Sequence, residues 1–241
     1  MLEKLEKFQI LLLALILGFS GIICAKVIAT STSNDAISVT GSYSQNVTSD
    51  YGLFNINLHS RKATRALTYA DLDKQVPIIK EYLKKQGFAD EDIEIKTTYG
   101  YDVNEIAPNG NSTNKYIAYD ATRKITVKSK DVQKIKKVAT EITSLNSAEI
   151  DLGVQEPEYL YSKLSDLKVE MLHAATKDAK QRAVAMLKAN HNTVGKIKSV
   201  QMGVFQITPV DSTDVSDYGI NDTSSIEKKV TAVANVKFRI K

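Results

Sequence analysis

Side chains that commonly carry catalysis are sparse and scattered in this chain. Its three histidines, His59, His173 and His191, fall on a predicted strand, within a predicted helix and at a helix end. No two of them have the spacing of metal ligands. The sequence also lacks the motifs that mark phosphate binding or nucleophilic hydrolysis. We therefore expect no enzyme activity, no cofactor and no metal, although scattered polar residues could still converge in space.

Four tyrosines are more suggestive. Tyr99, Tyr101, Tyr116 and Tyr119 flank an Asn- and Gly-rich segment on two neighbouring predicted strands. Cross-strand aromatic packing would explain such a group without any function. An interface between subunits is the sharper interpretation, because aromatic side chains are enriched where proteins meet. The sequence leaves both interpretations open.

The charged clusters have ordinary explanations. Residues 90–92 are acidic and precede a strand, as a solvated turn does, and Lys134, Lys136 and Lys137 lie on the polar face of a predicted helix. The whole chain has 32 basic and 28 acidic side chains, a net charge of +4. Nucleic-acid binding needs clustered, unopposed Lys and Arg. We therefore expect no nucleic-acid partner.

Residue periodicity predicts the elements that must position these side chains. Alternation indicates strands, and apolar residues at steps of three and four indicate helices. The predicted order is β-β-α-β-β-α-β-α-β-β, which implies an α+β domain of β-β-α units with mainly antiparallel sheets packed by three helices. The strands lie near 37–43, 54–58, 93–97, 117–127, 150–154, 194–204 and 230–240, and the helices near 72–83, 130–145 and 157–190.

Turn and loop residues connect these elements. Residues 49–52 suit a hairpin turn between the first two strands. Residues 103–115 are rich in Asn and Gly and predict a mobile hairpin loop. Residues 206–226 form a long polar stretch, and a loop of that length is usually functional or disordered. Pro77 conflicts with its helix and predicts a kink or a helix that begins near Gln75.

The chain begins with an apolar run. Eighteen residues from Phe8 to Ala25 carry no charge, and Lys4 and Lys7 precede them. About 18–20 apolar residues just span a bilayer. We predict an uncleaved membrane anchor, with the alternative of a signal peptide cleaved after Ala29. The anchor would use Phe8, Leu12, Leu15, Phe19 and Ile23.

This run sets the predicted domain organisation and address. Residues 1–33 form the anchor or signal and its linker, and residues 34–241 form one domain. The basic residues before the run favour a cytoplasmic N-terminus. We expect inner-membrane anchoring with the domain in the periplasm, or release into the periplasm after cleavage.

An ordered series of segments resembles the SIMPL-domain family. ISVTGSYSQ looks like its opening strand, and VTAVANVKFRIK resembles its terminal strand. Three segments between them are similar to its helix and strand steps: KEYLKKQGFADEDIEIKTTYGYD, YIAYDATRKITVKSKDVQKIKKV and DAKQRAVAMLKANHNTVGKIKSV. The resemblance covers about residues 36–241, and Tyr43 departs from it where a small residue is common.

The resemblance implies a function class. It implies an exported bacterial envelope protein, often linked to oxidative-stress defence, with no established catalytic residues. Some members look like ring-shaped oligomers, so a homo-oligomer or a protein partner is expected. A second hypothesis is a binding module for a small ligand or an envelope polymer that uses the 103–115 and 206–226 loops.

Overall fold

A computed structural model describes residues 2–32, 35–147 and 149–241. The side chains of residues 2–8, 10, 11 and 29–32 lie outside this description. The chain divides into two compact units. The first unit contains residues 1–41, 177–201 and 235–241, and the second contains residues 42–176 and 202–234.

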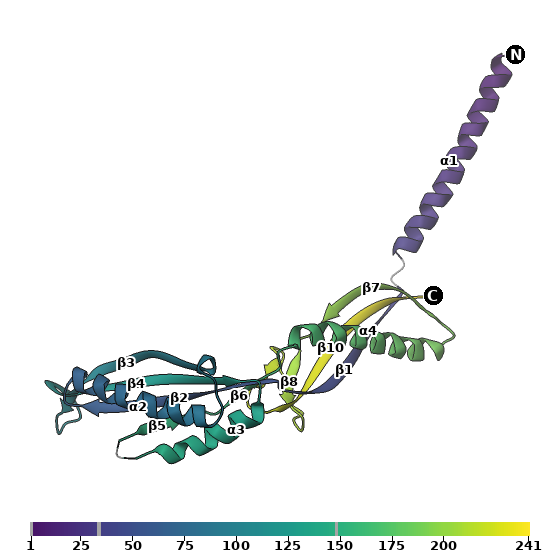
Figure 1. The fold of residues 1–241 in the computed structure, drawn as a ribbon. Helices are drawn as coiled ribbons and strands as arrows, with labels where there is room; N and C mark the ends of the chain where they lie inside the picture. Colours follow the sequence, from purple (N-terminus) through teal and green to yellow (C-terminus); the bar gives the residue numbers. More distant parts are fainter. Residues whose placement is uncertain (1, 33–34, 148) are drawn as a thin grey trace. The chain divides into compact units, whose positions relative to one another are not determined.

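Helix α1, Leu2–Thr32, contains the apolar run (Figure 1). Its described large apolar side chains are exposed, from 49% at Leu12 to 70% at Phe19. Across the described residues, no helix has both the length and the apolarity needed to cross a membrane. The predicted anchor at Leu12, Leu15, Phe19 and Ile23 is therefore not confirmed, and the side chain of Phe8 lies outside those described.

The second unit contains a sheet of five strands, which we call the central sheet. Its order is β3-β4-β2-β5, and β6 also pairs with β2. Strand β2 pairs antiparallel with β4, β5 and β6, and β3 pairs antiparallel with β4. Its strands are β2 Tyr51–Lys62, β3 Ile93–Ile106, β4 Ser112–Ser129, β5 Asp151–Val154 and β6 Glu158–Leu160.

Two helices bury an apolar face against the central sheet, α2 Arg65–Lys85 and α3 Val132–Glu141. Short 3-10 turns occupy Asp90–Asp92 and Ile142–Leu145. The core cluster is made of large side chains, including Phe54, Ile56, Leu58, Leu72, Ile79, Leu83, Ile125, Val127, Ile135 and Ile142. Alternation along β2 and the helical stripe of α2 predicted most of this core.

Helix α2 has clear start and stop signals. Thr64 caps it, because its side-chain oxygen accepts a hydrogen bond from the Leu67 N–H. Gly87 follows its end with φ +82°, where glycine carries no Cβ penalty. Pro77 lies within the helix on its exposed side. The predicted late start near Gln75 is therefore wrong. Pro77 removes one hydrogen bond of the helix, but on this exposed side the carbonyl left without a donor can bind water.

The second sheet, which we call the terminal sheet, has the order β1-β10-β8-β9, and β7 also pairs with β10. Along β10, alternate residues from Val230 to Phe238 are buried. Helix α4, Leu164–Lys188, buries a stripe that includes Met171, Ala175, Ala179 and Ala183. The strands are β1 Ala36–Thr48, β7 Val194–Met202, β8 Gln206–Pro209, β9 Ile220–Asn221 and β10 Glu227–Ile240.

The α+β class with mostly antiparallel sheets is confirmed, and the helix count is corrected. The described residues contain four α-helices rather than three, because the N-terminal run is itself a helix. The predicted helix at 157–190 begins later, at Leu164. Its first residues instead form β6, which pairs with Tyr51–Leu53. Proline is tolerated at the start of an edge strand as well as at the start of a helix. Pro157 therefore did not distinguish a strand from a helix in the sequence.

Two predicted connections also differ. Residues 49–52 do not join a hairpin, since β1 and β2 belong to different sheets. Distant segments hold this turn instead: the Ser49 N–H donates to the Ile226 carbonyl, and the Asp50 N–H donates to the Leu160 carbonyl. The 103–115 loop is shorter than predicted, because β3 continues to Ile106 and β4 starts at Ser112. The Asn- and Gly-rich composition of residues 103–115 suggested a loop, but several of these residues continue the pairing of β3 with β4.

Candidate functional site

Three of the four predicted interface tyrosines lie on the surface of the β3–β4 hairpin. The exposed fractions are 74% for Tyr99, 54% for Tyr101 and 43% for Tyr116. Tyr99 lies opposite Thr122, and Tyr101 lies opposite Asp120. Since alternate residues of a strand share a face, Tyr99 and Tyr101 project from the same side of the sheet. We call these three residues the tyrosine surface.

Tyr119 does not belong to this surface. It is 4% exposed, its ring stacks on Tyr69 at 6.1 Å, and the Arg65 guanidinium lies 4.7 Å from its centroid. Tyr119 and Asp120 are consecutive residues of β4, and consecutive strand residues face opposite sides, so Tyr119 faces the helix side of the sheet. Sequence grouping joined Tyr119 to the others because spacing alone does not show which face a strand buries.

Gly100 separates Tyr99 from Tyr101 and permits close packing beneath them. A Cβ at this position would lie 2.7 Å from the Asp120 carbonyl oxygen and 2.7 Å from the Tyr119 ring. Real Cβ atoms essentially never approach so closely. Gly100 thus lets β3 lie against Tyr119 while its two neighbours point outward.

His59 lies in the same cross-strand row as Tyr99. In register, Asp151 of β5 pairs with His59 of β2, His59 pairs with Thr122 of β4, and Thr122 pairs with Tyr99 of β3. The His59 Nε2 atom lies 2.8 Å from Asp120 Oδ1, and Nδ1 lies 3.0 Å from Asp151 Oδ2. These contacts place a histidine between two carboxylates on the tyrosine side of the sheet.

The two carboxylates determine what His59 can do. Burial of the ring favours its neutral form, but the hydrogen bonds to Asp120 and Asp151 outweigh burial and raise the pKa of His59. Ionised carboxylates only accept hydrogen bonds, so the protonated ring can donate to both of them, one from each nitrogen. In that state the ring has no free lone pair to act as a general base or metal ligand. Protonated His59 then links β5 to β4, and we call this arrangement the histidine clamp.

Sequence reasoning treated His59 as an ordinary boundary histidine and missed this cluster. The partners are 61 and 92 residues away along the chain. One signal was available: His59 alternates with the apolar positions of its strand, so it faces away from the core. Its partners follow only from the strand register.

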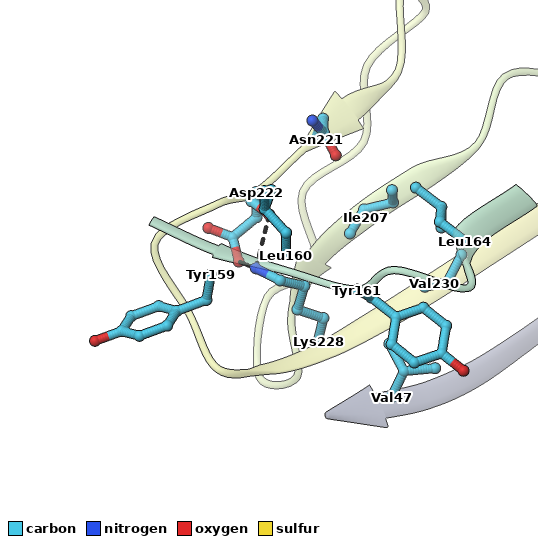
Figure 2. Close-up of a pocket in the computed structure, with 10 residues that line it drawn as sticks. All are labelled: Val47, Tyr159, Leu160, Tyr161, Leu164, Ile207, Asn221, Asp222, Lys228 and Val230. Atoms are coloured by element: carbon cyan, nitrogen blue, oxygen red, sulfur yellow. Dashed lines mark hydrogen bonds and ion pairs between the residues drawn. The ribbon is translucent and has the colours of Figure 1, made fainter. Parts of the chain in front are cut away.

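The pocket in Figure 2 contains a buried ion pair. Lys228 is 2% exposed, and its ammonium donates to the Asp222 carbonyl at 2.7 Å and to the Asp222 carboxylate at 3.2 Å. Burial raises the pKa of Asp222, but hydrogen bonds from Ser225 and Ser224 and from Lys228 outweigh it and hold the pKa well below its usual range. The remaining lining is mostly apolar: Val47, Tyr159, Leu160, Tyr161, Leu164, Ile207, Asn221 and Val230.

The size of this pocket decides against a ligand site. Its volume is about 100 Å³, whereas small-molecule sites usually occupy about 300–1,000 Å³. Both charged groups are already satisfied by each other and by the chain. The pair therefore serves the fold, fastening the 222–225 turn to the start of β10.

The 206–226 segment also lines a wider groove of about 550 Å³. Its walls include Met202, Val204, Val215, Asp217 and Val233. Residues 103–115 line neither this groove nor the small pocket. The structure thus does not bring the two predicted binding loops together at either cavity.

The remaining candidates have local structural partners. Asp90 pairs with Lys80 at 2.6 Å and with Lys84 at 2.7 Å. Lys134 donates to the Gly87 carbonyl and lies over the Phe88 ring. Arg123, which is unusual on an apolar face, donates to Thr98 and Asp73. In the part of the chain that the structure describes, no group of three or more His, Cys, Asp or Glu is arranged for a metal ion.

These features define an α+β protein built on two mostly antiparallel sheets, with an exposed aromatic surface on one of them. The chain belongs to the SIMPL family, whose model matches residues 37–238 and is described as a protein of unknown function (DUF541). A comparison with curated proteins returns no match. The family resemblance drawn from the sequence is confirmed.

Proposed function

We propose that this protein is a non-enzymatic component of the bacterial cell envelope that self-assembles or binds a protein partner through its tyrosine surface. The observation that supports this proposal is the exposure of Tyr99, Tyr101 and Tyr116 on one hairpin. Tyrosine and other aromatic side chains are enriched in interface cores and hot spots. An exposed ring gains most when a partner removes it from water.

A binding role agrees better with His59 than catalysis does. Both of its ring nitrogens are held by carboxylates, so the residue is already fully engaged. The clamp stiffens the sheet that carries the tyrosine surface. A rigid surface binds with a smaller loss of conformational entropy.

The oligomeric state tests assembly directly. Light scattering after size exclusion, on the full chain in a mild detergent at micromolar concentration, should show an oligomer. The double variant Tyr99→Ala/Tyr101→Ala should shift it to the monomer. Tyr218→Ala is the matched control, because Tyr218 is a 97% exposed tyrosine outside the hairpin. A wild-type protein that is a strict monomer would contradict self-assembly. Pull-down of a partner that the double variant no longer binds would then support only the partner-binding form of the proposal.

The N-terminal segment supports the proposed envelope location. The exposed apolar side chains of α1 favour a non-aqueous environment. We propose that this segment directs export, after which the chain is either held at the inner membrane or released into the periplasm by cleavage after Ala29. Mass spectrometry of the mature N-terminus, with cell fractionation, separates these two outcomes. An intact chain in the cytoplasm would contradict both.

A role in oxidative-stress defence is the part of the proposal that rests on the family resemblance alone. A strain without the protein should lose viability in peroxide, and wild type should restore it. Restoration by Tyr99→Ala/Tyr101→Ala as well would separate the stress role from the tyrosine surface.

The groove lined by Val204, Val215 and Val233 favours a second candidate, a binding module for a small ligand or an envelope polymer. Its volume of about 550 Å³ lies within the usual range of ligand sites. Val215→Asp should abolish binding of such a ligand and leave the oligomeric state unchanged. Loss of assembly in this variant would instead assign the groove to an interface.

A further inference from the structure

The histidine clamp and the tyrosine surface lie on the same side of the central sheet. His59 is next to Ser60 along β2, and Ser60 is buried on the helix side, where it donates to Asp71 of α2. Consecutive strand residues face opposite sides, so His59 points away from α2. The register pairs His59 with Thr122 and Thr122 with Tyr99, and directly opposed residues share a face. All of these residues belong to the second unit.

Asp120 connects the clamp to the tyrosines. Its carboxylate lies 2.8 Å from His59 Nε2, and its register partner on β3 is Tyr101. Cβ atoms of directly opposed strand residues are about 5 Å apart. The Asp120 side chain is only 12% exposed. A partner that covers Tyr101 therefore removes the remaining water from this carboxylate.

The size of an interface brings the whole clamp under such a partner. Neighbouring strands are about 4.8 Å apart, so His59 of β2 lies two strand spacings, or about 10 Å, from Tyr99 of β3. A stable interface covers about 800 Å² of each partner, which is much wider than this separation. A partner centred on Tyr99 and Tyr101 therefore also covers His59.

Protonation of His59 changes what that partner has to cover. The protonated ring has two N–H groups, one for Asp120 and one for Asp151, whereas the neutral ring has only one. The cluster carries a net charge of −1 with the proton and −2 without it. Burying a carboxylate that has lost its donor is costly, and interface cores are depleted of charge. Association should therefore favour the protonated cluster.

Neighbouring charged groups do not change this expectation near neutral pH. Other charged side chains on the same side of the sheet include Arg61 of β2, Lys124 and Lys128 of β4, Glu94 of β3 and Glu158 of β6. From α2, the Gln75 amide donates to the His59 carbonyl, and Asp71 accepts from Ser60. Histidine is the side chain whose ordinary pKa lies between pH 5 and 8. Burial lowers the pKa of His59, but the hydrogen bonds to its two carboxylates raise it above 6.5.

We propose that self-association through the tyrosine surface takes up a proton at His59, so that two copies of the chain bind each other most tightly in a mildly acidic medium. This inference rests on the proposed function and adds a regulation of the same surface. Because association favours the charged ring, it raises the pKa of His59 further in the oligomer. By linkage, a group whose pKa rises on association strengthens association as the pH falls.

The association constant at two pH values tests the inference. Light scattering after size exclusion, on a concentration series of the full chain in a mild detergent, gives this constant at about pH 5.5 and about pH 8.5. Wild type should associate about tenfold more tightly at the lower pH, the factor expected for one hydrogen bond to a charged group.

Three variants assign the effect. His59→Gln should associate equally at both pH values, about as weakly as wild type at the higher one. His59→Arg places a permanent charge between the carboxylates and should associate tightly at both. His173→Gln, at an exposed position of α4, should keep the wild-type difference. Circular dichroism of each variant at both pH values separates lost association from lost folding.

The outcomes distinguish this inference from the proposed function. An oligomer with equal affinity at both pH values would overturn the proton uptake and leave the tyrosine surface intact. A tenfold difference that persists in His59→Gln would assign the proton to another group and also overturn the inference. A strict monomer at both pH values would contradict self-assembly itself.

Discussion

The two sheets of this molecule bury different mixtures of side chains. The central sheet buries Phe54, Ile56 and Leu58 completely. The terminal sheet and α4 also bury large side chains, Phe238 and Met171, but they add a series of fully buried alanines: Ala175, Ala179, Ala183 and Ala234. An alanine removes less apolar area from water than Phe, Ile or Leu, so each of these positions contributes less to stability.

The two sheets also differ in whether a buried ion pair helps to hold them. A largely apolar cluster holds the central sheet, whereas a buried Lys228–Asp222 pair fastens the 222–225 turn to the start of β10. The comparison teaches that the middle of α4 buries small side chains, whereas α2 packs on the central sheet through large ones.

Truncation of the bulky core should have the largest effect. Phe54→Ala removes a fully buried ring and leaves a cavity, so unfolding should become easier by about 3–5 kcal/mol. Urea denaturation followed by circular dichroism measures this change. Tyr99→Ala, on the exposed face, should stay within about 0.5 kcal/mol. Equal losses in the two variants would contradict the assigned faces of the sheet.

Disruption of the polar fastening should come next. Asp222→Ala leaves the Lys228 ammonium buried without its counter-charge, and removing one partner of a buried pair costs about 3 kcal/mol. Because the pKa of Asp222 is depressed, its stabilisation is present above its ordinary pKa of 3.8 and is lost as pH falls through the folded pKa. Urea midpoints measured against pH test both statements.

Asp217→Ala is the control for that variant, since Asp217 is exposed on the same segment. It should change stability by less than about 0.5 kcal/mol. A similar loss in both variants would mean that loop conformation, rather than the ion pair, holds the turn.

Enlarging the alanine stripe tests how tightly α4 packs. Ala179 is fully buried, so Ala179→Leu should overpack and destabilise the protein by about 1–3 kcal/mol. Ala185→Leu, at an exposed position of the same helix, should be nearly neutral. Thermal unfolding of the pair gives the comparison. A neutral Ala179→Leu would reveal spare volume and weaken the contrast between the sheets.

The histidine clamp should have the smallest effect. The folded pKa of His59 lies above its ordinary value of 6.5, so its contribution is fully present below that pH and lost as pH rises through the folded pKa. The side chain is 38% exposed, and exposed pairs contribute about 0.2–1 kcal/mol. His59→Gln should remove this pH dependence, as measured by urea midpoints below and above neutrality. His173→Gln, at an exposed helix position, is the control.

Prediction succeeded where the signal was local. Helix α2 and strand β10 follow from the periodicity of their own residues. The errors occurred where partners are distant in sequence. The 49–52 turn joins two sheets because Ile226 and Leu160 hold it, and no local pattern reports such bonds.

The sequence alone was sufficient for the family, the α+β class, most buried positions and the apolar run, because composition and periodicity are properties of neighbouring residues. Strand register was needed to bring Asp120 and Asp151 to His59, and to send Tyr119 inward while Tyr99 and Tyr101 point outward. Contacts between residues far apart in the chain depend on which strands pair, and many pairings satisfy the same alternation. The folded chain selects one of them, and that selection forms the surface on which the proposed function rests.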